Sequence, residues 1–131
     1  MFGIDTNILV RYLTQDDPNQ AKRVNKLFDI AVKNREKIHI DIVVLCELVW
    51  VLREAYGFNK KTVVLTIEQI LSAAQFSIQD RDIISQALEI YSQNNGDFAD
   101  YLIGLKNRIR DCNITVTFDK ALKNNPLFSL L

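Results

Sequence analysis

The stretch that decides the fold is "MFGIDTNILVRYL", residues 1–13, because a short apolar segment runs directly into an amphipathic one. "MFGI" predicts a strand, and "ILVRYL" predicts a helix with one apolar face. Between them stand Asp5, Thr6 and Asn7, polar residues that suit a strand end and a helix start. A strand that leads straight into a helix is the repeating unit of α/β proteins, and the same order recurs along the rest of the chain.

Further helices and strands alternate after residue 13. Helical spacing of apolar residues and capping residues predict helices over 17–34, 42–57, 59–72, 80–96, 97–111 and 119–125. In these predictions Asp17 is an N-cap, Gly57 a C-cap, and Asp16, Asp80 and Asp82 have no role beyond capping. Short β-rich runs predict strands at 37–42, 76–78, 113–118 and 127–131. The sequence therefore predicts an α/β sandwich around a mostly parallel sheet.

Composition limits the class of protein. A chain of 131 residues that is 48% hydrophobic can bury one core, so we expect a single domain over residues 1–131. Sixteen basic residues balance sixteen acidic ones, so a polyanion must be held by local charge. We expect no membrane span, no targeting leader and a cytosolic location. A single histidine, His39, argues against a histidine zinc site, and Cys46 and Cys112 are expected to be reduced packing residues.

Four aspartates occupy positions where a ligand site is expected. Asp5 follows the first strand and Asp119 follows "ITVTF", so both are expected at the carboxyl edge of the sheet, where ligands collect. Asp97 and Asp100 are one turn apart at the start of a helix. Asp5, Asp97 and Asp119 each also suit a simpler role as a helix cap, and "DFAD" is by itself an acceptable capping box that includes Asp100. Position alone leaves both roles open.

Glu47 cannot be a cap, because it lies in the middle of "IVVLCELVWVL", residues 42–52. Its apolar neighbours favour a core-facing position, where an ionised carboxylate costs several kcal/mol unless it is paired. No Lys or Arg lies within one turn, so the partner is either a distant basic residue or a metal ion. Several carboxylates without histidine favour a hard cation, Mg²⁺ or Mn²⁺.

Four motifs in order, "DTNILVRYL", "ELVWVL", "DFADYLIG" and "TFD", give the chain a resemblance to a known family. It resembles the PIN-domain ribonucleases, and most closely the VapC-type toxins of bacterial toxin–antitoxin pairs. The resemblance covers nearly the whole chain. It implies an α/β/α sandwich with a central, mostly parallel sheet and a metal-dependent endoribonuclease activity on RNA.

The resemblance also implies roles for individual residues. Asp5, Glu47, Asp100 and Asp119 are the implied catalytic metal ligands, with Asp97 as an additional acid, for one or two Mg²⁺ or Mn²⁺ ions. Thr6, Asn7 and Thr117 are implied to orient the ligands or the substrate. The implied partners are RNA, a cognate antitoxin and a second copy of the chain. Many relatives have a small residue at the position of Tyr101, so this side chain is either core or part of the groove floor, where it would stack on a base.

An acid-rich site repels RNA, so nearby cations are needed to hold the strand. The candidates, each equally well explained as a solvated surface residue, are Lys22, Arg23, Lys26, Lys106, Arg110, Lys120 and Lys123. Two rival functions remain: a haloacid-dehalogenase-like phosphatase, which needs an acid where this chain has Asn7, and a catalytically inactive PIN scaffold that binds RNA or protein. A metal-dependent cleavage assay separates the second rival from a nuclease.

Overall fold

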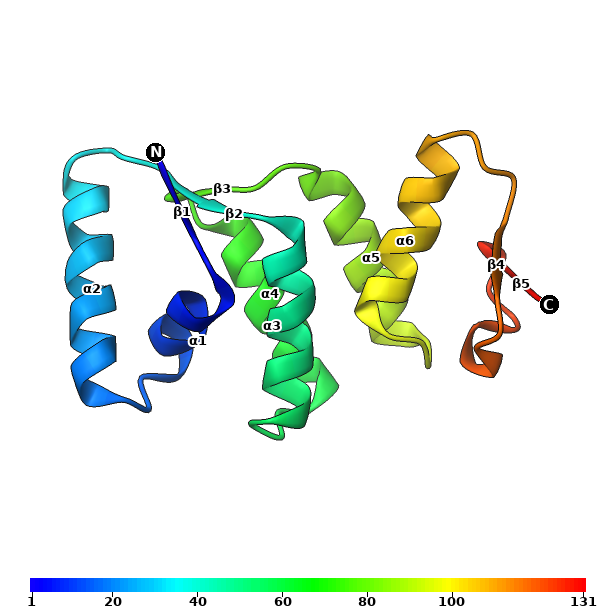
Figure 1. Ribbon diagram of the computed structural model, residues 1–131, viewed down its shortest axis with the longest axis horizontal. Helices are drawn as coiled ribbons and strands as arrows, with labels where there is room; N and C mark the ends of the chain where they lie inside the picture. Colours follow the sequence, from blue (N-terminus) through cyan, green and yellow to red (C-terminus); the bar gives the residue numbers. More distant parts are fainter. The chain divides into compact units, whose positions relative to one another are not determined.

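The computed structural model describes residues 1–131, and strands alternate with helices along the chain (Figure 1). The helices are α1 (Thr6–Thr14), α2 (Pro18–Lys33), α3 (Ile42–Glu54), α4 (Lys60–Ser72), α5 (Arg81–Gln93), α6 (Phe98–Ile109) and the short 3₁₀ helix η1 (Lys120–Leu122). The strands are β1 (Phe2–Ile4), β2 (Ile38–Ile40), β3 (Phe76–Ser77), β4 (Thr115–Thr117) and β5 (Phe128–Leu130). Every predicted helix and strand is present, and all paired strands are parallel, which confirms the α/β class.

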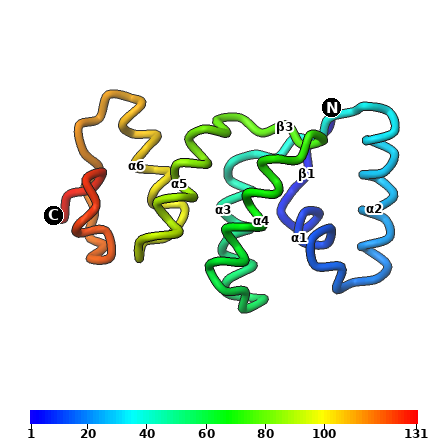
Figure 2. The backbone as a smooth tube through the Cα atoms, turned by 180° about the vertical axis from the view of Figure 1, so that it is seen from behind, coloured from blue at the N-terminus to red at the C-terminus, as the bar shows by residue number.

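The chain divides into two compact units, residues 1–79 and residues 80–131. In the first unit β1, β2 and β3 form a parallel sheet in that order, with Gly3 opposite His39 and His39 opposite Ser77. His39 also contacts the Ser77 carbonyl through Nδ1 at 3.0 Å, so the single histidine joins β2 to β3. Figures 1 and 2 both show α1 and α2 side by side.

The core of the first unit comes from the apolar stripes predicted by the sequence. Ile38 and Ile40 of β2 are fully buried, as are Leu45, Leu48 and Leu52 of α3. These α3 residues recur at three and four positions, so one face of the helix packs inward and the opposite face is exposed. Glu47 lies on that exposed face.

Aspartate and asparagine caps begin most helices of the first unit. Asp17 accepts the Gln20 N–H at 3.0 Å, which confirms the predicted cap of α2. Asp41, which the sequence analysis placed inside a strand, instead accepts the Val43 N–H at 2.8 Å and begins α3. The prediction that Gly57 is the C-cap of α3 is wrong: Ala55 is the C-cap, and Gly57 turns the chain two residues later at φ 66°.

In the second unit α5 and α6 pack against each other, and β4 pairs with β5 in parallel, Val116 opposite Ser129. Gly104 of α6 lies against β5, because a Cβ at this position would stand 2.9 Å from the Phe128 ring. Asp80 begins α5 without a side-chain cap and instead forms an ion pair with Lys106 at 3.3 Å, so its predicted capping role is wrong. No helix in either unit has the length and apolar character that crossing a membrane requires.

Candidate active site

Asp5 stands between β1 and α1 and caps the helix. Its Oδ1 accepts the Ile8 N–H at 3.2 Å, and its backbone is extended, as an N-cap requires. The side chain is exposed at the carboxyl end of β1. Since a carboxylate has two oxygens with several acceptor sites, one capping bond still leaves Asp5 able to bind a cation.

Thr6 joins the first acid of the chain to the mid-helix glutamate. Its hydroxyl Oγ1 donates to Glu47 Oε2 at 3.1 Å across 41 positions of sequence. Thr6 is buried, at 8% exposure, although its side chain is polar. Because Thr6 directly follows Asp5, this bond holds the Glu47 carboxylate near the start of α1.

Glu47 is not core-facing, so the prediction that burial forces a partner on it is wrong. The glutamate is exposed, and its helical neighbours Val43 and Trp50 are exposed as well, at 57% and 65%. The buried face of α3 is formed by other residues, so water solvates the Glu47 carboxylate without a desolvation cost. The remaining argument for a functional Glu47 is its bond to Thr6.

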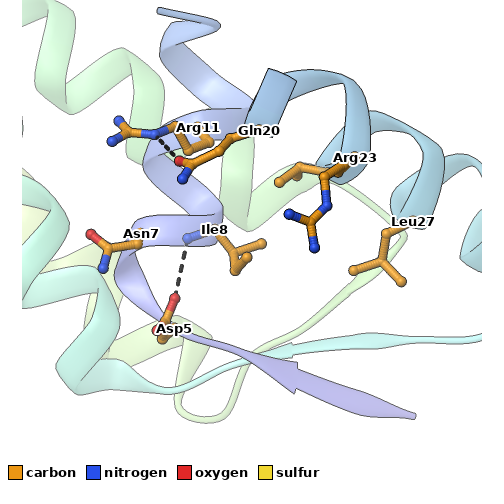
Figure 3. A pocket seen from close by; sticks show the side chains of 8 residues that line it. Asp5, Asn7, Ile8, Arg11, Gln20, Arg23 and Leu27 are labelled. Atoms are coloured by element: carbon orange, nitrogen blue, oxygen red, sulfur yellow. Dashed lines mark hydrogen bonds between the residues drawn. The ribbon is translucent and has the colours of Figure 1, made fainter. Parts of the chain in front are cut away.

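A cavity of about 450 Å³ opens beside Asp5 on the α1–α2 side of the first unit. Figure 3 shows the side chains that line it, which come from the start of α1 and from α2. They are Asp5, Asn7, Ile8, Arg11, Gln20, Arg23, Val24 and Leu27. Asn7, an implied substrate-orienting residue, therefore does face a space that a ligand can enter.

Asp16 is the centre of a hydrogen-bond network rather than a simple cap. It accepts from Tyr56 Oη at 2.6 Å, from Thr14 Oγ1 at 2.8 Å and from Arg11 Nη1 at 3.3 Å. The hydrogen bonds from Tyr56 and Thr14, followed by the Arg11 charge, hold the pKa of Asp16 below its ordinary value. The network fixes the turn between α1 and α2. No local sequence pattern predicts it, because Tyr56 is 40 positions away from Asp16.

The second unit brings three acids within electrostatic reach of one another. Asp100 Oδ2 accepts the Asp97 N–H at 3.0 Å, which is the half of a capping box contributed by the third helical residue. Burial, opposed by this bond and reinforced by the charges of Asp97 and Asp119, raises the pKa of Asp100. The charges of Asp97 and Asp119 both contribute to this shift, so the three carboxylates lie close enough to repel one another.

Asp119 follows β4 and caps η1 by accepting the Ala121 N–H at 2.9 Å. Its own N–H donates to Thr117 Oγ1 at 3.0 Å. Thr117 therefore orients the backbone that carries Asp119, which is the kind of supporting role implied for this threonine. Both Asp97 and Asp119 are exposed, so their oxygens are accessible to solvent cations.

Tyr101 is a core residue, and the alternative that it stacks on a base is wrong. Its side chain is fully buried, its ring packs edge-on to Phe128 at 6.4 Å between centroids, and its hydroxyl accepts the Gly96 N–H at 2.8 Å. A Cβ on Gly96 would stand 2.6 Å from that hydroxyl. Gly96 and Tyr101 are therefore packed tightly against each other at the start of α6.

The predicted RNA-holding cations lie in different surroundings. Arg23 lines the cavity that contains Asp5, whereas Lys22 and Lys26 line a separate hollow with Gln15 and Asp29. Lys106 is already paired with Asp80.

The two cysteines, Cys46 and Cys112, are free thiols. Cys112 is exposed, so the prediction that Cys112 is a packing residue is wrong.

Residues 3–126 match the family model of the PIN domain, which is nearly the whole chain. The chain belongs to the PIN domain family. A curated relative is the VapC ribonuclease of Aquifex aeolicus (strain VF5), with 24% identity over 120 residues, 92% of this chain and 88% of that protein. The resemblance inferred from the four motifs is confirmed.

The acids of this PIN domain come from both units: Asp5 and Glu47 from the first, Asp97, Asp100 and Asp119 from the second. The structure contains no group of three or more Asp, Glu, His and Cys side chains arranged to hold a metal ion. The donor set nevertheless fits a hard divalent cation, because every candidate ligand is a carboxylate, at least partly accessible to solvent, and none is histidine or thiolate.

Proposed function

We propose that this PIN domain is a metal-dependent endoribonuclease and the toxin of a toxin–antitoxin pair. The observation that carries the proposal is the Thr6–Glu47 hydrogen bond, because it ties an exposed mid-helix carboxylate to the residue after Asp5. A surface glutamate that is only solvated by water has no need of a hydrogen bond from a buried threonine hydroxyl. The named ribonuclease activity of the Aquifex relative supports the same function.

In this proposal Asp5, Glu47, Asp100 and Asp119 hold one or two Mg²⁺ or Mn²⁺ ions, with Asp97 as a further ligand. A cation held by these residues would supply Lewis-acid polarisation of the phosphodiester and would lower the pKa of the attacking water. The reaction is hydrolysis: water forms a new bond to phosphorus, the bond to the leaving sugar oxygen breaks, and that oxygen takes a proton.

The residues of the chain supply position and charge. The carboxylates set where the cation lies, Thr6 orients Glu47, and Thr117 orients the Asp119 backbone. Burial, with a smaller contribution from the charges of Asp97 and Asp119, raises the pKa of Asp100, and a bound cation would favour its ionised form. Asn7 lines the cavity beside Asp5, which supports a role for its amide in hydrogen-bonding to substrate.

Cleavage of a labelled RNA by purified protein tests the activity. Wild type is expected to cut with Mg²⁺ or Mn²⁺ and to stop cutting in EDTA, and Asp5→Asn to lose activity by at least about 100-fold, since it removes a proposed metal ligand. Asp17→Asn is the matched control, because Asp17 caps α2 as Asp5 caps α1 and is not a candidate ligand. A wild type that binds RNA without cutting it indicates an inactive scaffold.

The toxin part of the proposal predicts growth arrest when wild type is expressed without a partner, and normal growth with Asp5→Asn. Co-expression of a cognate antitoxin is expected to restore growth, and the antitoxin is expected to co-purify with the PIN domain. The resemblance to VapC-type toxins also favours a homodimer, which sedimentation of the purified protein tests.

A further inference from the structure

The cavity beside Asp5 has a second feature that the cleavage chemistry does not use. Two guanidinium groups, Arg11 and Arg23, line it together with Gln20, and the apolar side chains of Ile8 and Leu27 form part of its wall. A volume of about 450 Å³ lies in the range of pockets that bind small molecules or a nucleotide-sized segment. The cavity is thus larger and more cationic than a metal ligand alone requires.

Arg11 is held in place by the first unit. Its Nε donates to Gln20 Oε1 at 2.6 Å, and its Nη1 donates to Asp16 Oδ1 and to Tyr56 Oη, each at 3.3 Å. Asp16 neutralises part of the Arg11 charge. Arg11 therefore shapes the cavity wall and orients Gln20, and it is not the cation that is free to bind an anion.

Arg23 differs from Arg11 in having no acidic partner. The ion pairs of the structure join Met1 to Glu36, Arg11 to Asp16 and Lys106 to Asp80, and none includes Arg23. Its side chain is exposed, and Figure 3 shows the guanidinium extending from α2 into the space between α1 and α2. An unpaired guanidinium in a cavity is the arrangement that binds phosphate through two parallel N–H donors.

We infer that this cavity is a subsite for single-stranded RNA, in which Arg23 binds a backbone phosphate next to the cleaved bond and the Ile8–Leu27 wall faces the attached nucleotide. The inference rests on the proposed function. Asp5 belongs both to the proposed metal site and to the cavity, so a strand held at one continues into the other. An acidic peptide offers no comparable reason for the cavity to include Asp5.

Lys26, a candidate cation of the sequence analysis that does not line this cavity, provides the control. Lys26 lies one turn from Arg23 along α2, is exposed as well, and lines a different hollow with Gln15, Asn25 and Ile30. Arg23→Gln and Lys26→Gln therefore remove the same charge from the same helix. Only the first removes it from the cavity beside Asp5.

The test measures binding of a fluorescent single-stranded RNA of mixed sequence in EDTA, so that cleavage does not interfere, over a series of salt concentrations. Arg23→Gln is expected to weaken binding roughly 3- to 10-fold and to reduce the salt slope by about 0.7, the value for one phosphate contact on a single strand. Lys26→Gln is expected to leave both close to wild type. Arg23→Lys is expected to recover the slope and only part of the affinity, because lysine lacks the planar fork.

Equal losses in Arg23→Gln and Lys26→Gln would overturn the inference, since they would show general surface charge. It is also overturned if oligoglutamate, used as the peptide probe, binds in an Arg23-dependent way and RNA does not. Cleavage is measured separately in Mg²⁺. If Arg23→Gln selectively weakens RNA binding but the wild-type protein does not cut RNA, the RNA subsite is supported and the proposed nuclease activity is rejected.

Discussion

At the scale of single residues, Glu47 was predicted to face the core, and the structure shows that it is exposed. The apolar run from residue 42 to 52 predicts a buried helix, yet only one face of α3 is buried, and Glu47 stands on the other. The hydrophobic pattern does not distinguish the buried face of a helix from the exposed face when both faces carry Val, Leu or Trp. The bond from Thr6 was not predictable, because it joins residues 41 positions apart.

Glu47→Gln tests this residue. Glutamine keeps an oxygen that accepts the Thr6 hydroxyl and removes only the charge, so the free energy of unfolding is expected to change by less than about 0.5 kcal/mol. Metal-dependent RNA cleavage is expected to be lost. Glu54→Gln at the end of the same helix is the control. Marked destabilisation would instead show that the charge of Glu47 has a structural role.

Asp16 gives the clearest expectation for pH dependence. Its folded pKa lies below the ordinary 3.8, so it contributes stability that is present above this value and lost as pH falls through the folded pKa. Asp16→Asn is expected to lower Tm at pH 7, with a difference from wild type that shrinks at pH values below 3.8. Thermal melts over this pH range measure it. A difference independent of pH would indicate lost hydrogen bonding alone.

At the scale of elements, helices and strands were predictable and their ends less so. Caps such as Asp17 and Asn59 have local causes that the sequence displays. The start of α3 was missed because Asp41 follows the strand without a break, and the role of Asp80 was missed because Lys106 is distant in sequence. Local sequence patterns predict capping hydrogen bonds between near neighbours. They do not predict a contact with a residue distant in sequence, such as the ion pair of Asp80 with Lys106.

The start of α6 makes one prediction about charge. Asp100 has a raised pKa, chiefly from burial, so its ionised form is disfavoured in the folded protein and stability is lost as pH rises through that pKa. Asp100→Asn keeps an acceptor for the Asp97 N–H, so the metal-free protein is expected to be as stable as wild type at pH 7 or slightly more so. Chemical denaturation in EDTA measures this, and a clear loss would favour a purely structural cap.

The same helix makes a prediction about packing. Tyr101→Phe keeps the buried ring and removes the hydroxyl that accepts the Gly96 N–H, leaving a buried donor unpaired. The expected cost is about 1–3 kcal/mol of unfolding free energy, with RNA affinity in EDTA unchanged. A loss of RNA binding without a loss of stability would instead indicate that Tyr101 contacts RNA.

At the scale of the whole molecule, the parallel α/β plan was predictable because strands that alternate with helices along a chain usually pair in parallel. The division into residues 1–79 and 80–131 was not, since no linker composition marks it. Convergence of the acids of both units on one cation remains a prediction. It is the central claim of the proposed function, and each unit by itself supplies only part of the ligand set.

Titration of Mn²⁺ into the purified protein, followed by electron paramagnetic resonance of the free ion, tests that claim most directly. Glu47→Gln changes the first unit and Asp100→Asn the second, with Glu54→Gln as control. If the acids share a site, wild type binds one or two Mn²⁺ ions per chain, and each of the two site variants alone weakens binding at least about tenfold. Wild-type binding in both variants, or in either one of them, would contradict a site built by both units.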